Sequence, residues 1–207
     1  MGPLPVALLM FAAVLFAPIA NAAGDPAAGE TLAVTCVACH GQGGAAPIDP
    51  SYPVLAGQNE AYALRQLQAI QAGRRVIPLM TGLLNGKSDQ DLADMAAYFA
   101  AQPGVVGQAD ADEATLALAE SIYRGGILEK GVAACAACHS PMGDGNAPAG
   151  FPSVAGQPRS YTIAQLTAYR EGQRVTDEGF GGMMRSIASR LTDTEIAALA
   201  DYLRGLH

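Results

Sequence analysis

Cysteine and histidine, the residues best suited to hold a porphyrin or a metal, are concentrated in two short motifs of this chain. All four cysteines and two of the three histidines repeat the pattern C-x-x-C-H, as Cys36, Cys39 and His40 and as Cys135, Cys138 and His139. Two thiols one helical turn apart can form thioethers with the vinyl groups on one edge of a porphyrin, and the following histidine can bind the iron. The pattern predicts two covalently attached c-type haems.

A C-x-x-C pair also occurs in dithiol redox sites, zinc sites and structural disulfides. The strongest of these alternatives is a single zinc ion held by the sulfurs of both pairs. Such a site would leave unexplained why a histidine follows each pair at once. The remaining histidine is His207, at the C-terminus. Haem attachment is therefore the preferred interpretation.

The two motifs belong to an internal repeat. An offset of 99 residues aligns them and also aligns the Ala-Gly-Gln segments at 56–58 and 155–157. Farther along, the offset becomes 104, because a loop insertion falls at residues 176–182, and Met80 then aligns with Met184. The repeat predicts an N-terminal domain at residues 23–104, a linker at residues 105–110 and a C-terminal domain at residues 111–207. The linker lies in the stretch 102–110, where Pro and Gly punctuate the chain.

Both units are predicted to be helical, because apolar residues recur at helical spacing and no useful stretch alternates with a period of two. Helices are expected at residues 26–34, 59–72, 112–124 and 159–171. Two more should begin after the capping residues Ser88 and Thr192, the second within an S/T-x-x-E capping box. The predicted fold class is all-α: two tandem helical domains, each wrapped around one covalently attached haem that enlarges a small apolar core.

The sixth iron ligand is expected to be methionine, because His207 is the only histidine outside the motifs. The repeat nominates Met80 and Met184, each at a similar interval before the last helix of its unit. A methionine ligand closes the coordination shell and raises the reduction potential. The alternative is that both methionines are ordinary core residues, which is the commoner use of methionine.

Two further sets of residues have open roles. Pro53 and Pro152 follow the motifs at a similar interval, and a proline carbonyl there could accept the second N–H of the iron-binding imidazole. A plain turn before a helix is the alternative. Three arginines, Arg74, Arg75 and Arg174, could neutralise haem propionates. They could equally be solvated charges at helix ends, and this interpretation is slightly preferred.

Residues 1–22 are predicted to be a secretory signal peptide. An uncharged apolar stretch at residues 6–17 is followed by small residues that fit cleavage between Ala22 and Ala23. An uncleaved membrane anchor is the alternative, because residues 3–20 carry no charge. The chain has a net charge of −7 and no basic run, which argues against nucleic acid as a partner.

The assembled residues resemble those of the dihaem cytochrome c4 family over essentially the whole mature chain. The shared features are both C-x-x-C-H motifs, the Pro-x-x-Ala-Gly-Gln segments, the Tyr-x-x-x-Gln-Leu helices, and the segments Met80-Thr81-Gly82, Met183-Met184-Arg185 and Gly205-Leu206-His207. The resemblance implies two class I cytochrome c domains related by approximate two-fold symmetry, with haem propionates facing one another. It also implies two axial pairs, His40/Met80 and His139/Met184.

The resemblance further implies a monomeric periplasmic electron carrier rather than an enzyme, able to associate peripherally with the membrane. The expected donor is a quinol-oxidising complex or a dehydrogenase, and the expected acceptor is a terminal oxidase such as a cbb3-type enzyme. Two alternatives stay open. One is the electron-accepting subunit of a dehydrogenase, such as a sulfide-oxidising flavocytochrome. The other is a dihaem peroxidase, which would need an open sixth position on one iron.

Overall fold

The computed structural model describes residue 2 and residues 23–207. The predicted signal segment and its cleavage site at Ala22/Ala23 therefore lie almost entirely outside the described residues. Within the described part the regular structure is helical, apart from two isolated β-bridges, Ile127 with Val132 and Asn146 with Phe151. The all-α expectation is confirmed. None of the described helices is long and apolar enough to cross a membrane.

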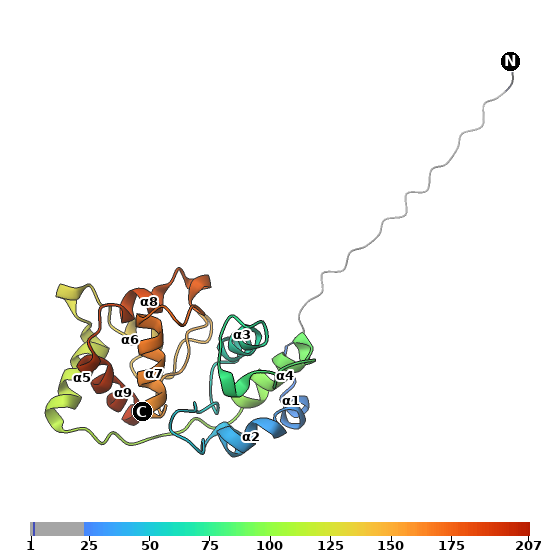
Figure 1. Ribbon diagram of the computed structural model, residues 1–207, viewed down its shortest axis with the longest axis horizontal. Helices are drawn as coiled ribbons and strands as arrows, with labels where there is room; N and C mark the ends of the chain where they lie inside the picture. Colours follow the sequence, from blue (N-terminus) through green and yellow to red (C-terminus); the bar gives the residue numbers. More distant parts are fainter. Residues whose placement is uncertain (1, 3–22) are drawn as a thin grey trace.

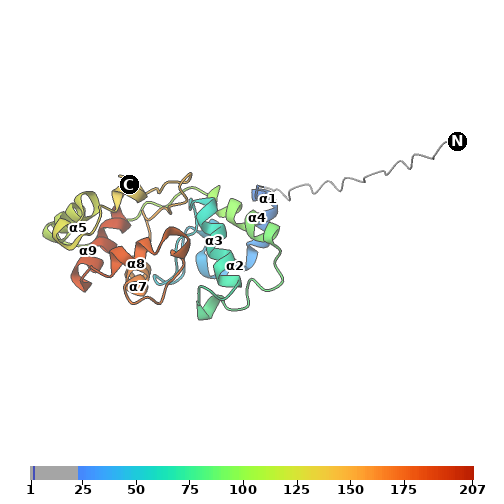
Figure 2. The same ribbon diagram turned by 90° about the horizontal axis from the view of Figure 1, so that it is seen from above.

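The helices form two lobes that lie side by side (Figures 1 and 2). The first lobe holds α1 (Pro26–Leu32), α2 (Val34–His40), α3 (Glu60–Gln71) and α4 (Asp89–Ala100). The second holds α5 (Glu113–Gly125), α6 (Ala136–His139), α7 (Arg159–Arg170), α8 (Met183–Ala188) and α9 (Asp193–Gly205). We call these lobes the N-terminal and C-terminal domains, and we call the segment between α4 and α5, residues 101–112, the linker.

In the N-terminal domain, α1 and α3 both pack on α4. Gly29 allows the close approach of α1, because a Cβ there would collide with the backbone carbonyl of Asp94. Helix α4 begins with a reciprocal capping box, in which the Ser88 hydroxyl accepts from the Asp91 N–H and the Asp91 carboxylate accepts from the Ser88 N–H. The buried side chains form two small clusters around Tyr98 and Leu92.

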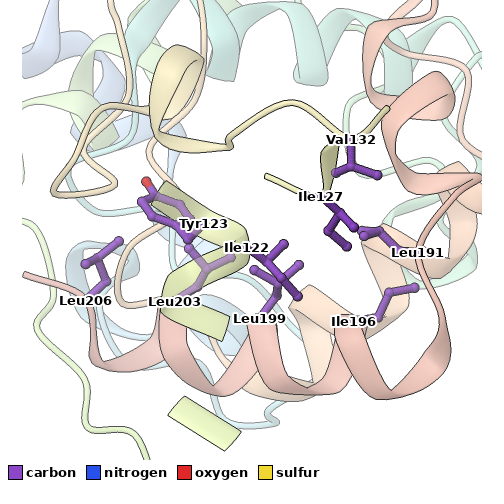
Figure 3. Close-up of a cluster of buried hydrophobic side chains, with 9 residues drawn as sticks. All are labelled: Ile122, Tyr123, Ile127, Val132, Leu191, Ile196, Leu199, Leu203 and Leu206. Carbon is purple, nitrogen blue, oxygen red and sulfur yellow. The ribbon is translucent and has the colours of Figure 1, made fainter. Parts of the chain in front are cut away.

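In the C-terminal domain, α5 and α7 pack on α9. Figure 3 shows the buried cluster between them, in which α5 side chains face α9 side chains: Ile122, Tyr123, Ile127, Val132, Leu191, Ile196, Leu199, Leu203 and Leu206. The expected capping box at the start of α9 is present, because the Thr192 hydroxyl and the Glu195 carboxylate accept from each other's backbone N–H.

The helices expected at residues 26–34 and 112–124 are present as α1 and α5, and the chain reaches each C-x-x-C-H motif from them in a different way. In the N-terminal domain α1 ends at Leu32, and a separate helix, α2, carries the motif and ends at His40. In the C-terminal domain α5 ends at Gly125, ten residues before Cys135, and Gly126 turns the chain with a φ of +74°. Both motifs still end a helix at their histidine, so each imidazole has the same local setting.

The linker runs against both domains. The segment between α4 and α5 contains no helix, and it passes close to the glycines of the two Ala-Gly-Gln segments. A Cβ on Gly57 would lie 2.8 Å from Cα of Gly104, and a Cβ on Gly156 would collide with the carbonyl of Val105. Both glycines have a φ of +69°, which residues with a side chain rarely adopt. The repeated glycine therefore serves both the turn and the passage of the linker.

Candidate haem-binding sites

Each motif histidine is fixed by a proline carbonyl. The distance from Nδ1 to the carbonyl oxygen is 2.9 Å for His40 with Pro53 and 2.9 Å for His139 with Pro152. Because a carbonyl can only accept, Nδ1 carries the hydrogen in both rings and Nε2 keeps its lone pair. This is the tautomer that a haem iron requires, and the structure favours the carbonyl-acceptor role of these prolines over a plain turn.

Burial keeps both imidazoles neutral. The side chains of His40 and His139 are 7% and 8% exposed. Desolvation lowers the pKa of each histidine below its usual 6.5, and the bond to the proline carbonyl acts in the opposite direction without reversing the shift. A neutral imidazole is the form that binds a metal, because its free nitrogen must be unprotonated.

The cysteines are arranged as two independent pairs of thiols. All four lie in the described part of the chain and form no disulfide there. Burial raises the pKa of Cys135 to about 11 and also raises the pKa of Cys36. Within residues 23–207 no group of three or more His, Cys, Asp or Glu side chains is placed to hold a metal ion. The two pairs therefore do not converge on the zinc site that was the main alternative.

The C-terminal domain holds a deep cavity next to its motif. Cys135, Cys138, His139 and Met184 all line it. Apolar side chains, among them Phe151, Phe180, Ile187 and Leu199, make up much of the remaining wall. The cavity thus combines an apolar interior with the thiols and the imidazole on one side, as a porphyrin requires. Met183 also lines it, but Met183 is exposed and Met184 is half-buried.

In the N-terminal domain, Met80 is the last residue of the 3₁₀ helix η2 (Pro78–Met80) and is half-buried. Two bonds to the Ile77 carbonyl hold this turn, one from the Met80 N–H at 2.8 Å and one from the Thr81 hydroxyl at 3.3 Å. Pro78 opens the helix at a position where its missing N–H needs no partner. The turn fixes the backbone that presents the methionine.

Arg75 and Arg174 lie at the domain interface, so their interpretation as solvated helix-end charges is wrong. The Arg174 guanidinium donates to the Tyr62 hydroxyl at 2.7 Å and to Gln66 Oε1 at 3.0 Å, and its exposed fraction is only 7%. The Arg75 guanidinium donates to the Tyr161 hydroxyl at 3.1 Å and to Gln165 Oε1 at 3.0 Å. Each arginine therefore reaches into the opposite domain. The local periodicity that placed both near helix ends could not reveal this.

These two guanidinium groups have no counter-charge among the described residues. Their hydrogen bonds go to hydroxyl and amide oxygens, and the ion pairs of the described chain involve other arginines and Lys130. A buried charge without a partner is costly. Arg174 lines the cavity of the C-terminal domain, as do Tyr62 and Gln66 from the other domain. The interface therefore suits an anionic group, and the carboxylates of a haem fit.

Two glutamines that the sequence analysis did not single out link the domains. Gln58 bonds to the backbone of Ser153, and Gln157 bonds to the backbone of Val54. Both belong to the repeated Ala-Gly-Gln segments. The repetition was the only available signal, and it could not tell a glutamine that holds its own domain from one that reaches across.

Comparison with known proteins agrees with this geometry. The Cytochrome c family model matches residues 26–102 and again residues 130–207. A cytochrome c4 of Pseudomonas aeruginosa is 50% identical over 189 residues, which cover 91% of this chain and 92% of that protein. The crystal structure of reduced recombinant cytochrome c4 from Pseudomonas stutzeri superposes with a TM-score of 0.85 at 46% identity, covering 89% of this chain and 100% of that one.

A more distant relative, from Stutzerimonas stutzeri, is named thiosulfate dehydrogenase electron acceptor. It is 34% identical over 177 residues, covering 82% of this chain and 78% of that protein. The family model matches two cytochrome c domains, and relatives named cytochrome c4 match most of the chain. Both findings support the same family assignment. The chain belongs to the cytochrome c family and, within it, to the dihaem cytochromes c4, electron-transfer proteins that carry two c-type haems and are not enzymes.

Proposed function

We propose that this protein carries electrons in the periplasm as part of a respiratory chain, from a quinol-oxidising complex or a dehydrogenase to a terminal oxidase, for example of the cbb3 type. The observation that carries the proposal is the placement of His139 and Met184 on one apolar cavity, with the imidazole already held in the ligating tautomer. A histidine and a methionine together would hold the iron of a bound haem and leave no ligand position open. Such an iron exchanges electrons without binding a substrate.

Each side chain of the motif has a defined role in this proposal. The thiols of Cys36 and Cys39 anchor one haem through thioethers, and those of Cys135 and Cys138 anchor the other. Nε2 of each motif histidine would bind the iron, while Pro53 and Pro152 hold Nδ1. The thioether sulfurs of Met80 and Met184 complete the coordination. When bound, each haem supplies a one-electron Fe(II)/Fe(III) couple.

The surrounding chain supports electron transfer in two ways. Buried apolar walls exclude water, which leaves little solvent to reorganise when the charge changes. Arg75 and Arg174 provide positive charge at the interface, where they can bind carboxylates of both prosthetic groups. Carboxylate edges bound there would bring the two haems toward the same interface, so that an electron can enter one domain and leave from the other.

The proposed location depends on the N-terminal segment. Cleavage between Ala22 and Ala23 would release the protein into the periplasm as a monomer able to associate peripherally with the membrane. N-terminal sequencing of the protein from the periplasmic fraction tests this. A start at Ala23 supports release, and an intact segment in the membrane fraction would support the anchor instead.

The coordination is tested by the visible spectrum of the dithionite-reduced holoprotein before and after carbon monoxide is added. A two-haem c-type spectrum that carbon monoxide leaves unchanged is expected, because Met80 and Met184 occupy the sixth positions. A shift of one haem would show an open site and would revive the peroxidase alternative. A matured protein without haem would contradict the whole proposal.

A second candidate function is the electron acceptor of a dehydrogenase, favoured by the relative named thiosulfate dehydrogenase electron acceptor. The chemistry of this chain would be the same, and only its donor would differ. Stopped-flow reduction distinguishes the two by comparing purified thiosulfate dehydrogenase with a quinol-oxidising complex as the donor. Copurification of a stable complex with a dehydrogenase would favour the second candidate.

A further inference from the structure

One peptide group in each domain lies between the motif histidine and a glutamine of the other domain. In the N-terminal domain it joins Pro53 to Val54: its oxygen accepts from His40 Nδ1 at 2.9 Å, and its N–H donates to Gln157 Oε1 at 3.1 Å. The same group therefore contacts the proposed iron ligand on one side and the opposite domain on the other.

The repeat reproduces this arrangement in the C-terminal domain. The peptide group that joins Pro152 to Ser153 accepts from His139 Nδ1 at 2.9 Å and donates to Gln58 Oε1 at 2.9 Å. The two connections cross, because the N-terminal glutamine serves the C-terminal histidine and the C-terminal glutamine serves the N-terminal histidine. The interface is thus built so that each histidine is linked to the domain that does not contain it.

Both glutamine amides are held at both ends. Gln157 Nε2 donates to the Val54 carbonyl at 2.9 Å, and Gln58 Nε2 donates to the Ser153 carbonyl at 2.9 Å. Each glutamine is 8% exposed. A flipped amide would place a donor against the peptide N–H and an acceptor against the carbonyl, so only one orientation satisfies both bonds. The oxygen that faces the peptide N–H is therefore fixed.

Hydrogen bonds in series polarise one another. When the N–H of a peptide group donates to a glutamine, the carbonyl of that group becomes a better acceptor. A better acceptor draws the Nδ1 hydrogen more strongly and increases the electron donation of Nε2 to a bound iron. Stronger donation favours Fe(III) over Fe(II) and so lowers the reduction potential.

We propose that Gln157 and Gln58 are positioning residues that lower the reduction potential of the haem in the opposite domain, through the peptide groups that hold His40 and His139. The inference rests on the proposed ligation by these two histidines. Domain docking then does more than hold the two haems near each other. It sets part of the electronic character of each iron, so a partner that loosens the interface would raise both potentials.

The test uses the full-length holoprotein and the variants Gln157→Met and Gln58→Met, which keep the side-chain length and remove the amide. The potential of each haem is followed separately by titration with assigned haem-methyl NMR resonances. Gln157→Met should shift the one-electron equilibrium of the N-terminal haem about twofold toward Fe(II). This shift corresponds to a reduction potential higher by ~18 mV, at 59 mV per decade. The other haem should not move, and Gln58→Met should give the converse.

A second readout is the Nδ1 proton of the histidine in the reduced, diamagnetic protein. In Gln157→Met the resonance of the His40 Nδ1 proton should move upfield, because its acceptor is weaker, and that of His139 should stay in place. Gln157→Glu keeps an acceptor oxygen and adds charge, so it should lower the N-terminal potential. Gln157→Met and Gln157→Glu should therefore shift the potential of the N-terminal haem in opposite directions. A residue that only packs the interface is not expected to do this.

Asn59→Ser is the matched control. Asn59 Nδ2 donates across the interface to the Phe151 carbonyl at 3.3 Å, and its Oδ1 caps α3. Serine retains the cap and loses the interdomain bond. It also keeps the backbone N–H of residue 59, which donates to Gln58 Oε1 at 2.9 Å, and it leaves the Pro53–Val54 and Pro152–Ser153 peptide groups in place. Neither potential should change. If this control moves the potentials as the glutamine variants do, interface loosening explains the effect and the proposal is overturned.

The remaining outcomes are also decisive. A shift of both haems, or of the haem in the substituted domain alone, contradicts the crossed connection. The methionine-methyl resonance, strongly shifted by a bound iron, is first recorded in the unsubstituted protein. Its absence would show that the proposed methionine ligation, and with it the proposed function, has failed. Its presence together with uncrossed or absent shifts would show that the ligation stands and only the role of the glutamines is wrong.

Discussion

The guanidinium of Arg174 lies 2.7 Å from the hydroxyl of Tyr62, so a buried charge of the C-terminal domain is held by a side chain of the N-terminal domain. The repeat forms the equivalent contact, from Arg75 to the Tyr161 hydroxyl at 3.1 Å. Neutral oxygens orient both arginines without neutralising them. The interface is therefore short of negative charge, which two haems with carboxylate edges would supply.

Replacing the buried arginine should destabilise the holoprotein and change its redox behaviour. Arg174→Gln is expected to lower the free energy of unfolding of the holoprotein by about 3 kcal/mol, because it would leave the proposed haem carboxylate without its counter-charge. It should also lower the reduction potential, since loss of positive charge favours Fe(III). Urea unfolding and potentiometric titration measure the two effects. Arg75→Gln, at the less buried position, should cause a smaller loss of stability. A potential that rises or stays constant would place Arg174 away from the haem carboxylates.

Opening one coordination position should make one haem reactive toward carbon monoxide. Met184→Ala is expected to bind about one carbon monoxide per reduced protein and to lower the potential of the C-terminal haem, because methionine raises it. Difference spectra measure the binding. Met80→Ala should do the same for the N-terminal haem, and the double variant should bind about two. Met183→Leu is the control and should bind none. Binding by Met183→Leu but not by Met184→Ala would exchange the two assignments.

Two pairs of glycines allow the energetic cost of backbone strain to be measured apart from the cost of a steric collision. Gly156 and Gly172 have φ angles of +69° and +70°, but only Gly156 is close to the linker, and nothing lies within 4 Å of a Cβ on Gly172. Gly172→Ala should lower the free energy of unfolding by about 1 kcal/mol, the usual penalty of this conformation. Gly156→Ala should lower it by about 3 kcal/mol or more, because the linker must also move. Urea unfolding of both variants is the measurement, and equal losses would show that the linker yields freely. Gly57 and Gly73 form the equivalent pair.

Acid should weaken the start of α9. Burial alone would raise the pKa of Glu195, but Lys130 at 2.7 Å and the bonds from Thr192 outweigh it and lower this pKa below its usual 4.5. A carboxyl group whose folded-state pKa is depressed stabilises the fold above its unfolded pKa, and this stability is lost as the pH falls through the folded value. Urea midpoints should therefore fall below about pH 4.5 less steeply in Glu195→Gln than in the unsubstituted protein. If the urea midpoints of the two proteins fell equally with pH, the proposed role of Glu195 would be contradicted.

Local sequence signals predicted the parts of this fold that depend on neighbours in the chain. Ser88 and Thr192 marked the starts of α4 and α9, because a capping hydroxyl acts on N–H groups three residues away. The C-x-x-C-H spacing predicted two thiols one helical turn apart, and each motif does lie in a helical segment that ends at its histidine. The repeat nominated Met184 over Met183, and both methionines line the cavity of His139.

What the sequence could not show depends on the docking of the two domains. The partners of Gln58 and Gln157 lie about a hundred positions away in the chain, and the repeat aligns each glutamine with its counterpart rather than with its partner. Arg174 was interpreted as solvated for the same reason, since its bonds to Tyr62 and Gln66 are made to the opposite domain. Helix α8 was also missed, because its six residues follow a glycine-rich loop that has no capping side chain.

The crossed glutamines also bear on how such a chain can arise. Each domain carries, on one surface, both the amide that reaches across and the peptide group that is reached, so that surface is complementary to a copy of itself. An unduplicated ancestor with this surface could pair with its own copies as a two-fold dimer. Gene duplication then needed to add only the linker, which replaces a concentration-dependent encounter by an effective concentration in the millimolar range. Once the copies were joined, each could diverge, and two identical electron carriers could become an ordered pair.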